Sequence, residues 1–268
     1  MAGVWFRVMP PEPVQNKPFS GNPGPKNMPP RNASPLQYFL LFFNLNLIRE
    51  VVRQTNRYAR THIRNTFLSR FSRARKWVPL TINEMKGFLA VILNMGIVRK
   101  PTIPEYWNKS HDSQLSRWFM KMFSRNRFQL ILKFFHLVDN KKIPNRNSPN
   151  YRPDSKIRPL IDHFNRVATY FYTPDRNICV DESLIGTRGR TAMLQYIPSK
   201  AAKFRVKFWV LAESTTGYVA HLKCYLGKKF TPTSNLLQGT EVVLRLLKNC
   251  NLLQKGYHVV CDSFFLQF

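Results

Sequence analysis

Two aspartates stand at the ends of apolar segments, where their carboxylates would suit metal-dependent chemistry on phosphodiesters. Asp181 follows an apolar run that begins near Ile178, and Asp262 closes a nearly all-apolar run that begins at Tyr257. A carboxylate that closes a buried strand is costly unless something compensates its charge, and a divalent cation does so well. If the two segments are neighbouring strands, the pair suits two magnesium ions about 3.5–4 Å apart. Because Asp also commonly begins a loop, the two residues alone are a weak motif.

The residues after Pro174 predict the elements that would position this pair. We expect four short strands, with one helix between the third and the fourth, over residues 177–183, 203–211, 218–226, 236–247 and 257–262. A tight turn at Thr216-Gly217 implies that the second and third strands form an antiparallel hairpin. Three antiparallel strands followed by a helical crossover to a fourth strand describe the first part of a ribonuclease-H-like fold. We therefore interpret 174–268 as an incomplete ribonuclease-H-like core.

The preceding part of the chain has the pattern of helices, so the predicted fold class is α+β. Apolar residues at helical spacing predict four helices, over residues 47–71, 83–96, 125–138 and 159–172. We assign 36–173 to a helical region for DNA binding and dimerisation. Nine prolines between residues 10 and 35 exclude a helix or a central strand. Residues 1–35 are accordingly expected to be a flexible arm.

The charge of the chain indicates a polyanionic partner. Forty-two Lys and Arg residues against 14 Asp and Glu give a net charge of +28. Such a field favours nucleic acid, with an acidic membrane surface or an acidic protein as the alternatives. Five arginines recur every three or four residues, which places them on one side of a helix: Arg49, Arg53, Arg57, Arg60 and Arg64. A solvated basic face is the simpler explanation, but acids are nearly missing there, which favours phosphate contact.

The four cysteines and the apolar segments exclude other classes of protein. No C-x-x-C pair occurs, so no zinc is expected in this chain, and the cysteines are interpreted as reduced thiols of an intracellular protein. No signal peptide is recognisable at the amino terminus. The most apolar stretch, residues 38–48, is too short and too polar to cross a bilayer, so no membrane partner is expected.

Blocks of sequence around the two aspartates are more specific than the aspartates themselves. They read DESLIGTRGR at residues 181–190, QYIPSK at 195–200, KFWVL at 207–211 and CDSFF at 261–265. The helical region adds TNRYA at 55–59, EMKGFL at 84–89, Met95-Gly96 and Tyr106-Trp107. Together these segments, over about residues 36 to 265, resemble the piggyBac transposases and the transposon-derived proteins of animals.

The resemblance implies a DDE transposase, in which three aspartates hold two divalent metal ions on a ribonuclease-H-like fold. Asp181 and Asp262 match the first two metal-ligand positions, for Mg²⁺ or Mn²⁺. Glu182 should point to the opposite face of its strand and is not counted as a ligand. Six basic residues and no acid lie between Gly186 and Val210, and we expect them against the DNA backbone: Arg188, Arg190, Lys200, Lys203, Arg205 and Lys207.

The chain also departs from the family pattern. The third aspartate and the cysteine-rich zinc module of the family lie downstream of Phe268 and are absent here, and Ser263 replaces the usual Asn. We therefore expect a nuclear, transposase-derived protein that binds DNA without cleavage activity of its own, with transposon-end and TTAA-containing DNA as the candidate sequences. The alternatives are an active transposase or nuclease, as a fragment or completed by another chain, and a protein-interaction remnant. The sequence leaves open whether the chain forms a homodimer.

Overall fold

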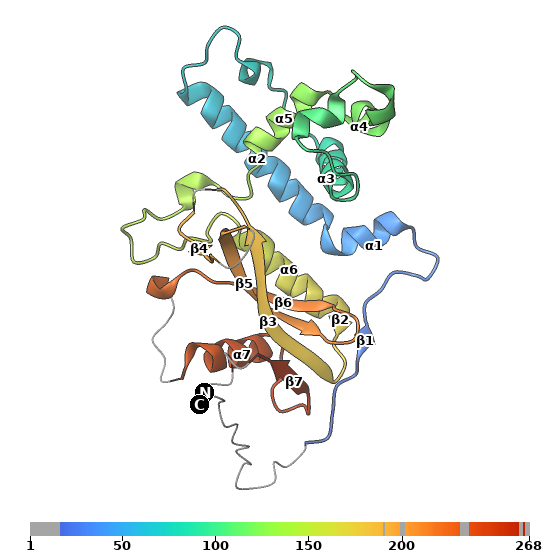
Figure 1. The fold of residues 1–268 in the computed structure, drawn as a ribbon, viewed down its shortest axis with the longest axis vertical. Coiled ribbons are helices and arrows are strands. Elements are labelled where there is room, and N and C mark those ends of the chain that lie inside the picture. The colour runs from blue at the N-terminus through green and yellow to red at the C-terminus, as the bar shows by residue number, and fades with distance from the viewer. Residues whose placement is uncertain (1–16, 190, 199–201, 231–235, 263–264, 266–268) are drawn as a thin grey trace, which may run out of the picture.

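Helices form one part of the molecule and a mixed sheet forms the other. The computed structural model describes residues 17–189, 191–198, 202–230, 236–262 and 265. The helical part lies above the sheet in Figure 1, and helix α1 (Pro35–Phe42) connects the two because it packs on helix α6 (Arg158–Phe171) beside the sheet.

The sheet contains the four strands that the sequence predicts, in the predicted order along the chain, and one further short strand, β4, that it did not predict. Its five strands are β3 (Asn177–Gly186), β4 (Leu194–Tyr196), β5 (Phe204–Glu213), β6 (Val219–Cys224) and β7 (His258–Cys261). Strand β3 pairs antiparallel with β5 on one side and parallel with β7 on the other, and β5 also pairs with β6 and β4. Helix α7 (Gln238–Asn249) provides the crossover between β6 and β7. The predicted hairpin turns at Gly217, whose φ of 71° is one that glycine adopts without strain.

The two faces of the sheet are covered differently. Ile178 and Val180 of β3 and Leu211 of β5 pack beneath α7 in one buried cluster. The opposite face carries a smaller cluster, in which Met193, Val206 and Cys224 are buried. Helix α6 lies along β6, where the Asn165 side-chain amide bonds both the backbone N–H and the backbone C=O of Leu222, each at 2.8 Å. This amide therefore satisfies backbone groups of β6 as a further strand would.

Capping side chains define the starts of the helices in the other part. Helices α2 (Leu45–Asn65), α3 (Ile82–Ile97), α4 (Arg117–Met122) and α5 (Arg125–Phe134) surround a core that contains Phe88 and Phe128. The side chains of Ser34, Asn44, Thr81 and Ser124 accept hydrogen bonds from the first turns of α1, α2, α3 and α5. Short 3₁₀ helices occur at Arg73–Lys76 (η1), Ile103–Trp107 (η2), Asp112–Gln114 (η3), Asn140–Lys142 (η4) and Lys228–Phe230 (η5).

Several predicted boundaries differ from the structure. The helix predicted over 47–71 ends at Asn65, the one over 125–138 ends at Phe134, and the first strand continues past residue 183 to Gly186. Each difference lies at an element end, where local sequence preference is weakest. No helix in the described part of the chain is long and apolar enough to cross a membrane.

Residues 19–27 of the proline-rich segment, for which the sequence predicts a flexible arm, make specific contacts with the rest of the molecule. The Phe19 ring packs edge-on against the Tyr257 ring, with the two ring centres 5.0 Å apart. The Ser20 backbone N–H donates to the Lys255 carbonyl. Strand β1 (Gly24–Pro25) pairs with β2 (Tyr172–Thr173). Prolines prevent a helix, but they allow an extended chain that an aromatic side chain anchors. A Cβ at Gly256 would lie 2.5 Å from the Pro18 carbonyl oxygen, so this contact requires glycine.

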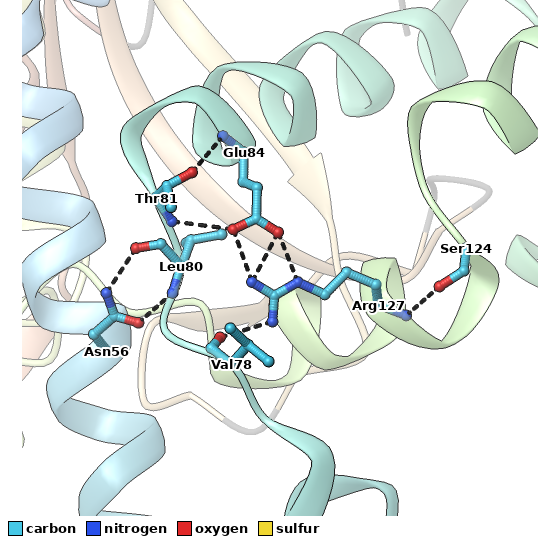
Figure 2. A network of polar contacts seen from close by, with 7 residues as sticks. All are labelled: Asn56, Val78, Leu80, Thr81, Glu84, Ser124 and Arg127. Carbon is cyan, nitrogen blue, oxygen red and sulfur yellow. Dashed lines mark hydrogen bonds and ion pairs between the residues drawn. The ribbon is translucent and has the colours of Figure 1, made fainter.

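A polar network ties α2, α3 and α5 together (Figure 2). The Arg127 guanidinium donates to both carboxylate oxygens of Glu84, at 2.8 and 2.9 Å, and to the Val78 carbonyl. The Asn56 amide bonds the backbone N–H and C=O of Leu80. Burial opposes ionisation of Glu84, but hydrogen bonds from Arg127 and Thr81 outweigh it and hold the pKa of this carboxyl below its ordinary value.

This network predicts a pH-dependent contribution to stability. A lowered folded-state pKa means that ionised Glu84 stabilises the fold fully above its ordinary pKa of 4.5, and that the contribution is lost as pH falls below that value. Glu84→Gln should therefore lower the free energy of unfolding by about 1–2 kcal/mol at pH 7, and by less at pH 3.5. Urea unfolding at both pH values measures the difference. In an Arg127→Gln background the effect of Glu84→Gln should shrink, and an undiminished effect would contradict the assigned pairing.

Candidate divalent-metal and nucleic-acid site

The two aspartates lie on neighbouring parallel strands, but only Asp262 directly follows its strand, whereas Asp181 lies in the middle of β3. The register of β3 and β7 pairs Val180 with Cys261, and Asp181 and Asp262 are the next residues along each strand. The condition that the sequence left open, that these strands are neighbours, is therefore met. Both aspartates are exposed, although the sequence predicts that each closes a buried strand. The reason is that α7 covers the face that carries Val180, whereas the aspartates lie on the other face with Val260, which is 64% exposed.

The backbone holds both aspartates in place. The Asp181 carboxylate accepts a hydrogen bond from the Glu182 backbone N–H at 2.7 Å. The Asp262 carbonyl accepts one from the N–H of Phe265 at 2.9 Å. Phe265 is buried, and its ring packs edge-on against the Trp209 ring with the ring centres 5.3 Å apart. This contact anchors Phe265 to the core.

The chemistry of these residues fits a partly hydrated divalent cation. Carboxylate oxygens are the ligands that Mg²⁺ and Mn²⁺ prefer, and Mg²⁺ is commonly held by one or two carboxylates together with water and substrate phosphates. Within the described residues, no group of three or more His, Cys, Asp or Glu side chains is arranged to hold a metal. Asp181 and Asp262 would thus provide two ligands, and the remaining positions would be open to water or phosphate.

The cysteines have a different environment. All four are free thiols, and burial raises the pKa of both Cys224 and Cys250 to about 12. A zinc ligand must be a thiolate, and ionisation of these two thiols near neutral pH is therefore costly.

The arginines of α2 lie on one side of the helix as predicted, opposite the buried residues Ile48, Val51 and Ala59. Two of the five are engaged by acids. Arg53 pairs with Glu50, and Arg57 pairs with Asp139 from the segment after α5, each at 2.6 Å. The other three, Arg49, Arg60 and Arg64, are exposed. Arg49 donates to the Asn46 side chain and Arg60 donates to the Asn56 carbonyl, and both of these acceptors are neutral. Arg49, Arg60 and Arg64 thus keep uncompensated charge among the described residues.

The second basic stretch is less uniform than its sequence suggests. Arg188 and Lys203 are exposed. Arg205 donates to the Ala202 carbonyl at 2.6 Å, which fixes the start of β5. Lys207 forms an ion pair with Glu182 on the face of the sheet that α7 covers, and its ammonium lies 3.8 Å from the centre of the Trp209 ring. The prediction that Lys207 contacts DNA is therefore not supported by its position, because a neighbouring acid compensates its charge. Arg190 and Lys200 lie outside the described residues.

A cleft of about 770 Å³ opens beside the aspartate face. One wall is the segment 140–157, which contributes Arg146 and Lys156. The other wall includes Ile185 of β3 and Phe208 of β5. Ile185 lies on the same face of β3 as Asp181, because side chains alternate along a strand. Arg146 and Lys156 thus line a largely apolar cleft on the face of the sheet that carries the aspartates, four residues along β3 from Asp181, and no sequence motif indicated this.

Sequence reasoning also missed two buried acids. Glu213, at the end of β5, is 2% exposed and accepts hydrogen bonds from the Tyr172 hydroxyl, the Asp175 N–H and the Thr216 hydroxyl. Asp154 is 4% exposed and pairs with Arg152 at 2.9 Å. A lone acid directly after the apolar run of residues 208–212 is the one signal that could have pointed to Glu213.

Together the fold and the aspartate pair define the class, an α+β protein whose sheet has the order of a ribonuclease-H-like core. Comparison with known proteins agrees with this class. A family model described as "Transposase IS4" matches residues 34–268. A solved piggyBac transposase synaptic complex with hairpin DNA superposes with a TM-score of 0.73 and 25% identity, over 90% of this chain and 52% of that one. The chain therefore belongs to the piggyBac-type transposase family.

Human relatives are similar over most of this chain. The human piggyBac transposable element-derived protein 5 is 27% identical over 210 residues, which are 78% of this chain and 38% of that protein. The human piggyBac transposable element-derived protein 3 is 28% identical over 236 residues, which are 87% of this chain and 36% of that protein. The chain thus spans less than two fifths of the length of these relatives.

Proposed function

We propose that this chain is a transposase-derived DNA-binding protein that contacts the phosphate backbone through the exposed arginine face of α2 and the cleft lined by Arg146 and Lys156. The observation that carries this proposal is the uncompensated charge of Arg49, Arg60 and Arg64 in a chain of net charge +28. The similarity to a piggyBac transposase solved with hairpin DNA supports it. Since the partner is DNA, we also propose a nuclear location.

The test is direct measurement of binding to labelled duplex DNA by fluorescence anisotropy. We expect binding at low salt that weakens steeply as salt increases. Duplexes with and without a central TTAA distinguish backbone contact from sequence recognition. Binding that is absent or independent of salt would contradict the proposal and would favour a protein-interaction role. Size-exclusion chromatography with light scattering reports whether the free protein is a dimer.

Metal-dependent DNA strand cleavage is a second candidate function, favoured by the position of Asp181 and Asp262 on neighbouring strands. A bound Mg²⁺ or Mn²⁺ would supply charge stabilisation for attacking and leaving oxygens at a phosphodiester. The protein's own contribution would be to hold the two carboxylates side by side and to place the DNA in the cleft. Aspartate-dependent strand-transfer products from DNA that carries TTAA would establish this activity in place of binding alone.

We expect the aspartate pair to bind Mn²⁺ weakly, and Asp181→Asn or Asp262→Asn to reduce that affinity at least tenfold. Each substitution removes one of the two anionic ligands at the site. Water-proton relaxation or electron paramagnetic resonance titration measures Mn²⁺ binding without reference to activity. Glu182→Gln is the matched control, because it removes an adjacent carboxylate that faces the other side of the sheet. An equal loss with Glu182→Gln would show that the ion responds to general surface charge.

A further inference from the structure

The segment between α2 and η1 presents two phenylalanines to solvent. Phe67 is 97% exposed and Phe71 is 88% exposed, the highest values for large apolar side chains among the described residues. Figure 1 shows this segment at the end of α2 that is remote from α1 and from the sheet. Two aromatic side chains so fully exposed, four residues apart in one short segment, depart from ordinary burial, and exposed apolar surface of this kind commonly marks a binding site.

The backbone that carries these rings is held by specific contacts. Leu68, between the two phenylalanines, packs against the cluster that contains Ala74 and Phe134. The Arg75 guanidinium donates to the Leu68 carbonyl at 2.6 Å and to the Ser69 carbonyl at 3.0 Å. With Leu68 directed inward and the turn closed by Arg75, Phe67 and Phe71 are directed outward by the local fold.

The surroundings of the two rings are uniformly basic. Five cationic residues and no acid lie between residues 64 and 76: Arg64, Arg70, Arg73, Arg75 and Lys76. Their recorded partners are neutral. Arg73 bonds the side-chain oxygens of Asn126 and Gln129, Arg75 bonds backbone carbonyls, and the Arg70 guanidinium lies 5.9 Å from the centre of the Phe71 ring. An occupant of this surface must therefore be anionic and must also offer flat apolar groups.

Nucleic acid with accessible bases has both properties. Phosphates would meet the cations, and an unstacked base offers a π-face that stacks on an aromatic side chain whatever its identity. Arg60 and Arg64, on the last turns of α2, connect the exposed arginine face to this segment, so one strand could follow both. An acidic membrane surface would meet the same charge, but only the nucleic acid continues along the arginine face.

We propose that Phe67 and Phe71 stack on nucleobases of DNA that is single-stranded or locally opened, while Arg64, Arg70 and Lys76 contact its phosphates. The proposal rests on the DNA binding proposed above and adds how unpaired bases are held. It implies a preference for single-stranded, gapped or hairpin DNA over an intact duplex of the same length.

The test compares wild type with Phe67→Ala/Phe71→Ala on single-stranded DNA that contains 2-aminopurine, whose fluorescence reports base stacking. We expect affinity to fall about tenfold for each ring removed, with an unchanged salt slope, and the change of 2-aminopurine fluorescence on binding to disappear. Arg70→Ala should instead reduce the salt slope by about 0.7. Phe67→Tyr/Phe71→Tyr should restore affinity, because it keeps both rings. Ile97→Ala, at a residue 82% exposed outside this basic segment, is the control for general loss of apolar surface.

The outcomes separate this inference from the proposed function. If wild type binds DNA and the double alanine variant binds it equally well with the same fluorescence change, base stacking is refuted and DNA binding stands. If wild type binds no form of DNA, both proposals fail. Both proteins are also titrated with phosphatidylserine vesicles. If the double alanine variant loses affinity only for these vesicles and not for DNA, the surface binds membrane and the inference is overturned. Both phenylalanines are exposed, so unfolding midpoints should be unchanged and a folding defect can be recognised.

Discussion

Raising the salt concentration from about 50 to about 200 mM is expected to weaken DNA binding by this chain on the order of a thousandfold. Each phosphate that a Lys or Arg neutralises releases condensed counterions, so the logarithm of affinity falls linearly with the logarithm of salt, by about 0.9 per contact on duplex DNA. Over this fourfold range of salt, a thousandfold change corresponds to a slope of about 5, which is about five or six contacts. The exposed and uncompensated cations described above, Arg49, Arg60, Arg64, Arg188 and Lys203, supply most of that number.

The arginine face of α2 can be tested by the salt slope, which is the fall of log affinity with log salt concentration, as well as by the affinity itself. Arg49→Ala/Arg60→Ala/Arg64→Ala should lower the salt slope by about 2.7, three contacts at about 0.9 each. The matched control on the same helix is Arg53→Ala/Arg57→Ala, which removes two arginines that acids already neutralise. This control should change the slope by less than about 1, because few counterions are released there. A triple variant with the wild-type slope would place the DNA elsewhere on the molecule.

Glu213→Ala should lower the free energy of unfolding by about 3 kcal/mol or more, because three donors lose their acceptor in a buried place. The donors belong to the segment before β3 (Tyr172 and Asp175) and to the β5–β6 turn (Thr216), so Glu213 links parts of the chain that meet only after folding. Desolvation, together with the hydrogen bond to Glu213, raises the pKa of Tyr172, which keeps its hydroxyl protonated as a donor. Typical domains are stable by only about 5–15 kcal/mol, so this loss is large.

Two milder substitutions calibrate the effect of Glu213→Ala. Glu213→Gln retains one acceptor oxygen and should cost roughly half as much, and Tyr172→Phe, which removes one donor, should cost about 1 kcal/mol. Urea unfolding followed by tryptophan fluorescence measures all three. Because Trp209 lies in the same sheet, its emission reports the relevant transition. A Glu213→Ala protein that unfolds at the wild-type urea concentration would show that water replaces the carboxylate without cost.

The arrangement of strands and helices was predictable because its signals are local. Thr81 and Glu84 form a capping box at the start of α3, and the turn at Gly217 imposes an antiparallel hairpin. The spacing of the arginines of α2 follows from the helical repeat alone. The helical crossover through α7 likewise predicts that β7 is parallel to β6. That β7 pairs with β3, which brings Asp181 and Asp262 onto neighbouring strands, is known only from the structure.

What only the tertiary structure decided is which charges are compensated and which are exposed. Asp139 lies far along the chain from Arg57, and no spacing rule joins them. Lys207 looked like a phosphate ligand until the register of β3 and β5 brought Glu182 beside it. The aspartates are exposed because α7 covers only one face of the sheet. Residues 19–27 contact distant parts of the chain, among them Tyr257, which packs against Phe19. Local sequence determined the elements and their order, whereas the electrostatics of the site depend on contacts between distant segments, which form only when the chain is folded.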